Sequence, residues 1–401
     1  MITTSTYDFT TRIDRRGTGS AKWEGMYHAC PDVPAGIVPF SVADMEFKNP
    51  PEVAETATEY VRTQVLGYTE PTDAYFDAVC GWQRRRHGWD VSREWVVTSP
   101  GVVPALFECV KAFTEPGDGV IVQPPVYYPF RRAVEQTGRA MVENPLVRVD
   151  DDHYEMDFVD LERKAADPAN KMIIVCSPHN PVGRVWTADE LRRLVEICLA
   201  NDVLVVCDEI HNDLVMPGVT HTTIQRVVPE ERRSRVITCT APSKTFNLAG
   251  LQCSNIIIPG EDERKQFLKS RSASTGQFGL NAFAYPVCRA VYERCEGWLE
   301  ELLGVLDANR RLLADFLESE LPQAKAYPLE GTYLQWVDFR WMGLPDKELE
   351  AFMQREARLF LDEGYLFGTG GSGFERFNIA CPRDVLQEGL ERLVAAVRAR
   401  G

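Results

Sequence analysis

The fold is decided by the stretch VITCTAPSKTFNLAG at residues 236–250, where an apolar run leads into a lysine. Val236–Thr240 has the length and the β-branched content of a buried strand. Lys244 follows it among apolar residues, which is a poor place for a solvated surface charge. A lysine removed from water has a lowered pKa and becomes a nucleophile toward an aldehyde. Alone, however, such a lysine is more often structural than catalytic.

Similar apolar runs alternate with helical patterns on both sides of this stretch. A helix fits at Thr187–Asn201, where Thr187 can cap the first turn and apolar residues line one face. Nearly continuous apolar strands that alternate with helices predict a mostly parallel sheet covered by helices on both faces. The expected strands are Trp95–Thr98, Gly119–Gln123, Met172–Cys176, Val203–Cys207, Val236–Thr240 and Ser254–Ile258.

A chain of 401 residues is too long for one hydrophobic core, so we expect two domains. The C-terminal third predicts an α+β unit, with amphipathic helices at Trp298–Leu317 and Asp346–Glu363 around a strand at Thr332–Phe339. The N-terminal stretch, rich in glycine and proline, predicts an extended arm that packs on another part of the chain. The expected units are 1–60 (arm and part of a small domain), 61–295 (large domain) and 296–401 (C-terminal small domain).

The composition excludes several classes of partner. A net charge of −15 argues against nucleic acid and anionic membranes. The apolar runs are too short to span a bilayer, and Met1–Arg16 lacks the apolar core of a signal peptide. The eleven cysteines are scattered singly and do not cluster with histidine, which predicts a cytoplasmic protein without structural zinc or another bound metal.

Residues of unusual chemistry follow four of the expected strands, where ligands of doubly wound sheets gather. Gly101 and Val102 either offer backbone amides to an anion or form a plain turn. Prolines on both sides of Asn180 either present its amide rigidly or shape a turn before a helix. Asp208 ends a strand, where a buried acid needs a cation such as a pyridinium or an arginine. Together with Lys244, these are the parts that pyridoxal 5′-phosphate (PLP) requires.

In order and spacing, these elements resemble the fold-type I PLP enzymes of the aspartate aminotransferase superfamily. More narrowly, the chain resembles the MalY/PatB branch of cystathionine β-lyases, also called cysteine-S-conjugate β-lyases, nearly from end to end. The resemblance implies an α/β fold with a large PLP-binding domain, whose mostly parallel sheet is sandwiched by helices, and a smaller α+β domain. The matching segments are DRRGTGS (14–20) with KW (22–23), VADMEF (42–47), PPVYYPF (124–130), PHNPVGRVW (178–186), DEIH (208–211) and PSKTFNLAGL (242–251).

The resemblance implies roles for the residues that hold the cofactor ring. Lys244 would bind PLP covalently and move the substrate's α-proton. Asp208 would pair with the protonated pyridine nitrogen, and Asn180 would donate to the phenolic oxygen of the ring. Tyr128 would stack on the ring and count among the catalytic residues, although its neighbour Tyr127 is an alternative.

Other residues would hold the phosphate group of PLP. Gly101 and Val102 would bind it through backbone N–H groups, and the Ser243 hydroxyl would help or merely shape the loop. Tyr68 resembles the tyrosine that a neighbouring subunit donates to the phosphate, which implies a homodimer; a tyrosine packed at a turn is the alternative. Gln252 stands where family members often have a phosphate-binding arginine, so that contact is expected to be lost.

The substrate would be held mainly by Arg376, whose planar fork suits the α-carboxylate of an amino acid. Ala43 would close over the substrate through its backbone, with Tyr127 and Asn180 beside it. His211 replaces the tyrosine of the aminotransferases, and a structural and a cofactor-binding role are equally open for it.

β-Elimination and transamination use the same cofactor residues, so these motifs alone do not separate them. The N-terminal arm, the paired tyrosines and His211 resemble the lyase branch. They favour cleavage of the carbon–sulfur bond in L-cystathionine or a related L-cysteine conjugate, which gives pyruvate, ammonia and a thiol. The alternatives are a PLP-dependent aminotransferase acting with a 2-oxo acid and a PLP-binding regulatory protein with residual lyase activity. Tyr333 and Trp336 are expected to line the core or pocket wall without chemistry.

Overall fold

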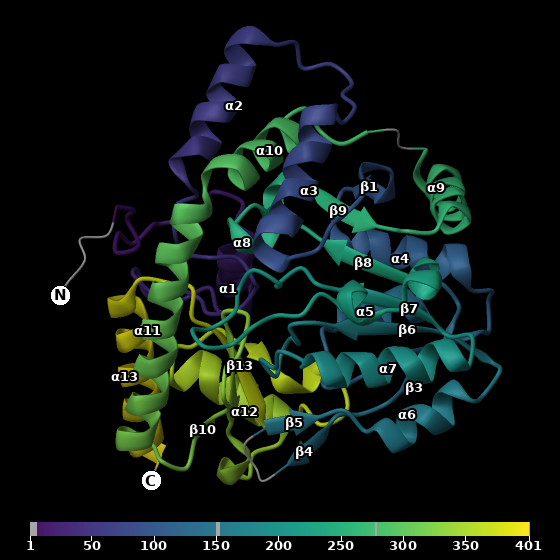
Figure 1. The fold of residues 1–401 in the computed structure, drawn as a ribbon. Coiled ribbons are helices and arrows are strands. Elements are labelled where there is room, and N and C mark those ends of the chain that lie inside the picture. The colour runs from purple at the N-terminus through teal and green to yellow at the C-terminus, as the bar shows by residue number, and fades with distance from the viewer. Residues whose placement is uncertain (1–5, 150–152, 277–278, 401) are drawn as a thin grey trace.

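A seven-stranded sheet forms the centre of the computed structural model, which describes residues 6–149, 153–276 and 279–400 (Figure 1). The strand order is β1-β9-β8-β7-β6-β2-β3, and every pairing is parallel except those of β9, which is antiparallel to both neighbours. The strands are β1 (Val96–Ser99), β2 (Gly119–Val122), β3 (Ala140–Glu143), β6 (Asn170–Cys176), β7 (Leu204–Asp208), β8 (Val236–Thr240) and β9 (Ser254–Ile257).

All six expected strands are present, and the mostly parallel sheet is confirmed. The edge strand β3 was not expected, because it is partly exposed and has no continuous apolar run. A separate hairpin joins β4 (Val147–Val149) to β5 (His153–Glu155).

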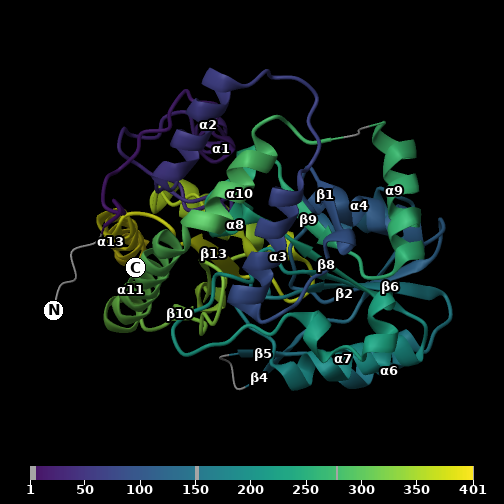
Figure 2. The ribbon, with the colours of Figure 1, turned by 45° about the horizontal axis from the view of Figure 1, so that its top comes forward.

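Helices cover both faces of the sheet, because successive strand residues point to opposite sides (Figure 2). In β6, Met172 and Ile174 pack toward α4, α5 and α9, whereas Ile173 and Val175 pack toward α6 and α7. Thr187 and Glu190 form a capping box at the start of α7, as the sequence predicts for Thr187. The helices in this part of the chain, on both faces together, are α3 (Asp73–His87), α4 (Val102–Phe113), α5 (Pro129–Glu135), α6 (Phe158–Ala165), α7 (Ala188–Ala200), α8 (Pro242–Thr245), α9 (Glu261–Thr275) and α10 (Ala284–Arg294).

A second, antiparallel sheet of order β10-β11-β13-β12 lies in the C-terminal part and packs with the helices α11 and α13. The helix expected at Trp298–Leu317 is confirmed within α11, and the strand expected at Thr332–Phe339 contains β11. The elements are α11 (Glu296–Glu320), β10 (Lys325–Ala326), β11 (Leu334–Asp338), α12 (Asp346–Ala351), β12 (Asp362–Glu363), β13 (Phe374–Asn378) and α13 (Arg383–Arg400).

The prediction of one helix over Asp346–Glu363 is wrong. Only α12 is α-helical; residues 352–356 form a wider π-helical turn, and the chain ends this stretch as strand β12. The reason is that Leu359, Phe360 and Leu361 are all buried, which an extended segment achieves and a one-sided helix does not. The left-handed backbone of Arg358 (φ 51°) turns the chain at that point.

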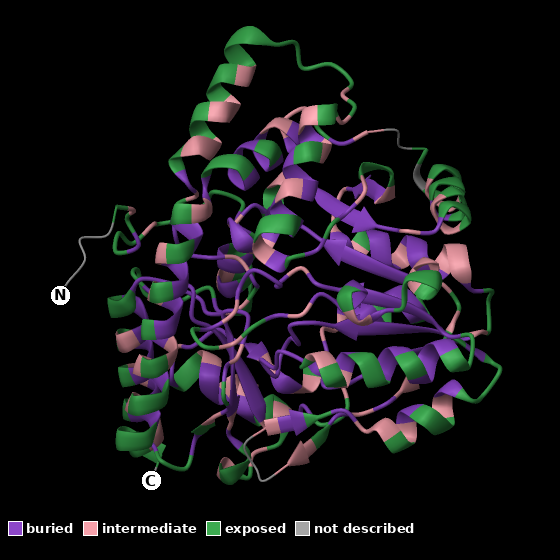
Figure 3. Cartoon of the chain, viewed as in Figure 1, coloured by how far each residue is buried: buried purple, intermediate pink, exposed green. Residues whose placement is uncertain are grey.

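The N-terminal arm packs on the C-terminal part, as expected. Phe9 meets Phe47 edge-on at 5.2 Å and lies 5.3 Å from Trp298, and Arg12 pairs with Asp384 and Glu388 of α13. The arm contains α1 (Ala21–Ala29) and is followed by α2 (Pro51–Thr63), which projects from the molecule without a single buried residue (Figure 3). The expected division at residues 60 and 295 stays a prediction.

All eleven cysteines are buried free thiols, in line with their expected use as small hydrophobic residues. No described helix is long and apolar enough to cross a membrane. Within the described residues no group of three or more His, Cys, Asp or Glu side chains could hold a metal ion. The stretch Met1–Arg16, expected to lack a signal peptide, begins with residues 1–5, which lie outside the described part.

Candidate active site

The carboxyl ends of three neighbouring strands bring the predicted cofactor residues together. Asp208, the last residue of β7, is in register with Cys176 of β6 and Cys239 of β8. The segments that carry Asn180 and Lys244 follow these two strands directly, so they lie on either side of Asp208. This is the position at which the sequence places a ligand.

Lys244 lies in the short helix α8 with its amine turned toward the segment that carries Ala43. Its Nζ donates a hydrogen bond to the backbone carbonyl of Ala43 at 2.6 Å. Burial lowers the pKa of Lys244 to about 8, and the positive charge of Arg376 acts in the same direction. The amine is therefore partly neutral near physiological pH and able to act as a nucleophile or a base.

Asp208 is buried without a cation. It is 4% exposed and accepts one hydrogen bond, from the backbone N–H of Ile210 at 3.1 Å, but it forms no ion pair with any described residue. Burial raises its pKa to about 7. A buried carboxylate in this position is costly until a cation faces it, and a protonated pyridine nitrogen would be such a cation.

Arg376 of β13 is held between an amide and a carboxylate. It is 2% exposed; Nη1 donates to Oδ1 of Asn180 at 2.9 Å, and Nη2 donates to Asp362. The Nε atom is buried and has no partner among the described residues. The guanidinium also lies 5.0 Å from the ring of Phe367. It is thus fixed in place with several of its five N–H groups, that of Nε among them, left over for an anionic ligand.

The paired tyrosines precede α5, and their ring centroids are 5.4 Å apart. Burial raises the pKa of both hydroxyls, and the charges of Arg376 and Asp362 act on both. Asp208 is among the charges that act on Tyr127, whereas Arg132, which lies 5.1 Å from the ring of Tyr128, is among those that act on Tyr128. Both rings border the site, and Tyr127 is the one that faces Asp208.

His211 and Tyr333 complete the wall. The two rings meet edge-on at 5.8 Å, and the Tyr333 hydroxyl donates to the carbonyl of Ala43 at 2.8 Å. Burial and the charge of Lys244 hold the pKa of His211 well below its ordinary value, so the imidazole is neutral. Its Nδ1 is buried without a partner in the described part of the chain. A ligand that offers a hydrogen bond could satisfy this atom.

The expected phosphate cradle lies at the end of β1. Gly101 precedes α4 and accepts a hydrogen bond at its carbonyl from the Ser99 hydroxyl at 2.9 Å. Val102 is the first residue of α4, so its N–H is among those without a partner inside the helix. Ser243 is buried beside Lys244. Gln252, which stands where related enzymes often have a phosphate-binding arginine, closes the turn before β9.

Tyr68 is the one predicted residue that does not reach this site within the chain. It lies fully exposed in the segment between α2 and α3 and makes no hydrogen bond or ring contact with the described residues.

Three residues of the site had not been assigned a role from the sequence. Asp362 holds Arg376 and also accepts from the backbone N–H of Val42 at 3.1 Å; Tyr333 and Asp44 act on either side of Ala43. The sequence placed Asp44 within the matching segment at residues 42–47 and Tyr333 in the core or pocket wall, but it gave no signal for Asp362.

The residues present fit PLP. The amine of Lys244 is partly neutral, Asp208 forms no ion pair with a described residue, and the buried Nδ1 of His211 and Nε of Arg376 lack partners in the described chain. Together with the free amides at the start of α4, they match an aldehyde, a pyridinium and a phosphate on one planar molecule, with an amino-acid carboxylate next to it.

Comparisons with known proteins agree with this chemistry. Residues 35–393 match the family described as aminotransferase class I and II. Cystathionine β-lyase PatB of Bacillus subtilis (strain 168) is 44% identical over 392 residues, 97% of this chain and 100% of PatB. Protein MalY of Escherichia coli (strain K12) is 30% identical over 394 residues, 98% of this chain and 99% of MalY. The crystal structure of cystalysin from Treponema denticola, which contains PLP, matches with a TM-score of 0.97 and 48% identity, over 99% of this chain and 100% of cystalysin.

Proposed function

Because the chain belongs to the aminotransferase class I and II family, and within it to the branch of PatB and MalY, we propose that it is a PLP-dependent carbon–sulfur β-lyase. It cleaves L-cystathionine or a related L-cysteine conjugate and, with one water consumed, releases pyruvate, ammonia and a thiol. The full-length match to a cystathionine β-lyase carries the choice of reaction. The site geometry supports PLP as the cofactor for either reaction.

Each part of PLP has a residue to hold it. Lys244 would hold the aldehyde carbon, Asp208 would face the ring nitrogen, and Asn180 would donate to the phenolic oxygen. The amide is oriented for this role because its Oδ1 already accepts from Arg376. Gly101 and Val102 would bind the phosphate through backbone amides, with the Ser243 hydroxyl beside them. When bound, PLP supplies an electron sink that stabilises negative charge at the substrate's Cα.

The protein's own groups then handle the proton and the carboxylate. The amine of Lys244, with a pKa of about 8, takes the proton from Cα. Arg376 binds the α-carboxylate, and Ala43 lies over the substrate beside them. Asp208 stays an anion while a cation faces it, because that pairing offsets its burial. The thiol leaves from Cβ, and no amino group is passed to a second substrate.

One of the paired tyrosines stacks on the ring. The sequence favours Tyr128, but the proximity of Tyr127 to Asp208 supports Tyr127 as the stacking residue and Tyr128 as a substrate contact. Replacing the stacking tyrosine by alanine weakens PLP binding, whereas replacing the other raises KM alone. Titration of each apoprotein with PLP distinguishes the two.

The enzyme acts as a homodimer in the cytoplasm. The projecting helix α2 and the segment after it expose Val61, Val65, Leu66 and Tyr68, which supports a contact with a second copy of the chain. In that dimer Tyr68 reaches the phosphate in the neighbouring subunit. The eleven free thiols support a reducing compartment.

The deciding experiment mixes PLP-loaded protein with L-cystathionine, without any 2-oxo acid, and follows pyruvate and free thiol. Equal amounts of both over many turnovers are expected. If neither forms, but added 2-oxoglutarate is converted to glutamate in the presence of an amino donor, the enzyme is an aminotransferase. If PLP binds and no amino acid turns over, the regulatory alternative replaces the lyase. The Lys244→Ala protein is the control for turnover by free PLP.

A further inference from the structure

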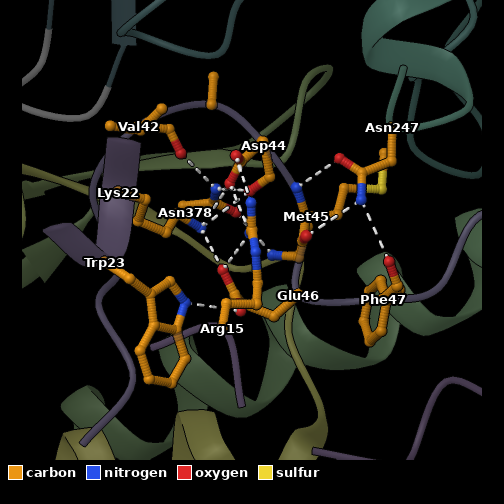
Figure 4. Close-up of polar contacts among 12 residues, drawn as sticks. Arg15, Lys22, Trp23, Val42, Asp44, Met45, Glu46, Phe47, Asn247 and Asn378 are labelled. Carbon is orange, nitrogen blue, oxygen red and sulfur yellow. Dashed lines mark hydrogen bonds and ion pairs between the residues drawn. The ribbon is translucent and has the colours of Figure 1, made fainter. Parts of the chain in front are cut away.

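Two cationic side chains of the N-terminal arm, Arg15 and Lys22, form ion pairs with the loop at residues 42–47 (Figure 4). Lys22 of α1, with a side chain 1% exposed, donates to the backbone carbonyl of Asp44 at 2.9 Å and lies 3.3 Å from its carboxylate and 3.1 Å from that of Glu46. Arg15 binds both oxygens of Asp44, at 3.1 and 3.0 Å, and Glu46 at 2.9 Å. Trp23 donates to the other oxygen of Glu46 at 3.1 Å.

Two asparagines hold the backbone of the same loop. Asn378 of β13 donates to the carbonyls of Val42 and Asp44 at 2.8 and 2.6 Å. Asn247, three residues after Lys244, exchanges hydrogen bonds with the backbone of Met45 at 2.9 and 3.0 Å. Val42 adopts φ 43°, a left-handed conformation that a β-branched residue avoids unless its surroundings impose it.

These contacts fix the position of one backbone carbonyl group in the loop, that of Ala43. Ala43 lies at the centre of the loop, and its oxygen accepts from Nζ of Lys244 at 2.6 Å and from the hydroxyl of Tyr333 at 2.8 Å. This oxygen is therefore the acceptor for the ε-amine whenever that amine is free. Among the described residues, Arg15, Lys22 and Trp23 form their hydrogen bonds and ion pairs with the loop and not with the amine itself.

The same network sets the charge that Lys244 faces. Asp44 and Asp208 favour the protonated amine, and Arg376 and Lys22 oppose it. His211 also faces the amine, but it is neutral. Burial disfavours ionised Asp44, yet Lys22 and Arg15 hold its pKa below the ordinary value, so it carries its charge. Across the arm and the loop, the cations Arg15 and Lys22 pair with the anions Asp44 and Glu46.

We propose that the Lys22–Asp44 pair is a positioning device for Lys244: it fixes the Ala43 carbonyl that accepts a hydrogen bond from the free ε-amine, and it sets the charge that this amine faces. The inference rests on the proposed function only in taking Lys244 as the group that moves the substrate's proton. It also gives the N-terminal segment KW at residues 22–23 a role in catalysis without contact with substrate.

The test measures the pKa of Lys244 in the full-length apoprotein, from the pH dependence of its labelling by an amine-reactive reagent, read by mass spectrometry. Lys22→Met keeps the buried stem but removes the cation, so the pKa of Lys244 should rise by roughly one unit. Asp44→Asn removes the anion, so the pKa should fall by a similar amount. A pair that merely supported the fold would move both variants in the same direction or in neither.

Two controls accompany these variants. Lys22→Arg keeps the charge and should return the midpoint toward the wild-type value. Arg12→Met removes another cation of the same arm, one that pairs with Asp384 and Glu388 on α13, and should leave the midpoint unchanged. If Lys22→Met does not fold, Asp44→Asn alone decides, since an unchanged or higher midpoint overturns the proposal.

The holoenzyme gives a second readout. In Lys22→Met the rising limb of the kcat–pH profile should move to higher pH, with KM for L-cystathionine changed less than kcat at neutral pH. An unmoved limb overturns the proposal. The labelling needs neither PLP nor substrate. If the wild-type protein forms no pyruvate while the two variants show the opposite shifts, the proposed function is refuted and this inference stands.

Discussion

At the scale of single residues, the site contains buried polar groups that gain a partner only when a ligand binds. Asp208 is buried without a cation, and the Nδ1 of His211 and the Nε of Arg376 are buried without partners in the described chain. Each such group costs free energy until a ligand satisfies it. Ligand binding should therefore stabilise the folded protein as well as enable the reaction.

Lys244→Ala should abolish turnover, because it removes both the anchor for PLP and the base with a pKa of about 8. The visible absorbance band of covalently held PLP should disappear as well. Steady-state assay and a visible spectrum check this outcome. Retention of turnover and band together would remove Lys244 from the mechanism.

Arg376→Ala should lower kcat/KM roughly 100-fold, as expected for the loss of two charge-assisted hydrogen bonds of about 1.5 kcal/mol each. Most of the loss should appear in KM. Arg376→Lys keeps the charge that Asp362 requires but loses the fork, and so separates carboxylate binding from loss of the buried ion pair. An unchanged KM in both variants would mean that another group holds the carboxylate.

At the scale of elements, the pairing of β12 with β13 places two carboxyl groups opposite each other. Glu363 and Glu375 are in register, and Oε2 of Glu375 is buried without a partner among the described residues. Burial raises the pKa of Glu363 to about 7 and that of Glu375 well above its ordinary 4.5, and Asp362 raises both further. Between 4.5 and these raised values, the folded state binds more protons than the unfolded state, so stability falls as pH rises through this window.

Glu375→Gln should therefore raise the free energy of unfolding at pH 8 by at least about 1 kcal/mol, because the amide needs no proton to stay neutral. The gain should shrink as the pH falls toward 5. Urea unfolding of both proteins at several pH values measures it. The exposed Glu318→Gln on α11 is the matched control and should change nothing. A gain that is independent of pH would assign the effect to packing.

At the scale of the whole molecule, each site is expected to be completed by a second copy of the chain. The structure holds the cofactor residues of one chain together but leaves Tyr68 fully exposed beyond α2. An exposed aromatic beside exposed aliphatic residues marks an interaction surface more often than a solvated one. The proposed homodimer buries that surface and brings Tyr68 to a phosphate.

Co-expression of Lys244→Ala with Tyr68→Ala should restore activity, because each mixed dimer then contains one site with an intact lysine and an intact tyrosine. Random pairing gives about a quarter of the wild-type specific activity. Each variant expressed alone is the control, and sedimentation measures the dimer. If the mixture shows only the average of its parents, Tyr68 does not act across an interface.

The sequence by itself determined the parallel sheet, the strand-end positions of Asp208 and Lys244, and the branch of PLP enzymes to which they belong. These follow from local patterns: apolar runs, prolines and short motifs lie in contiguous stretches, so neighbouring residues suffice to predict them. The same local reading failed at residues 346–363, where a helix and a buried strand share one apolar pattern.

Only the tertiary structure decided how the site is held. Lys244 and Ala43 are 201 residues apart, Tyr333 and Ala43 are 290 apart, and the Asp362 that binds Arg376 lies on a neighbouring strand. No period or spacing in the chain marks such pairs, because they form where segments distant in sequence pack together and a buried charge must find a partner. The hydrogen bond from Lys22 to the carbonyl of Asp44, in the loop that carries Ala43, belongs to the same class of contact, because it depends on how the N-terminal arm packs.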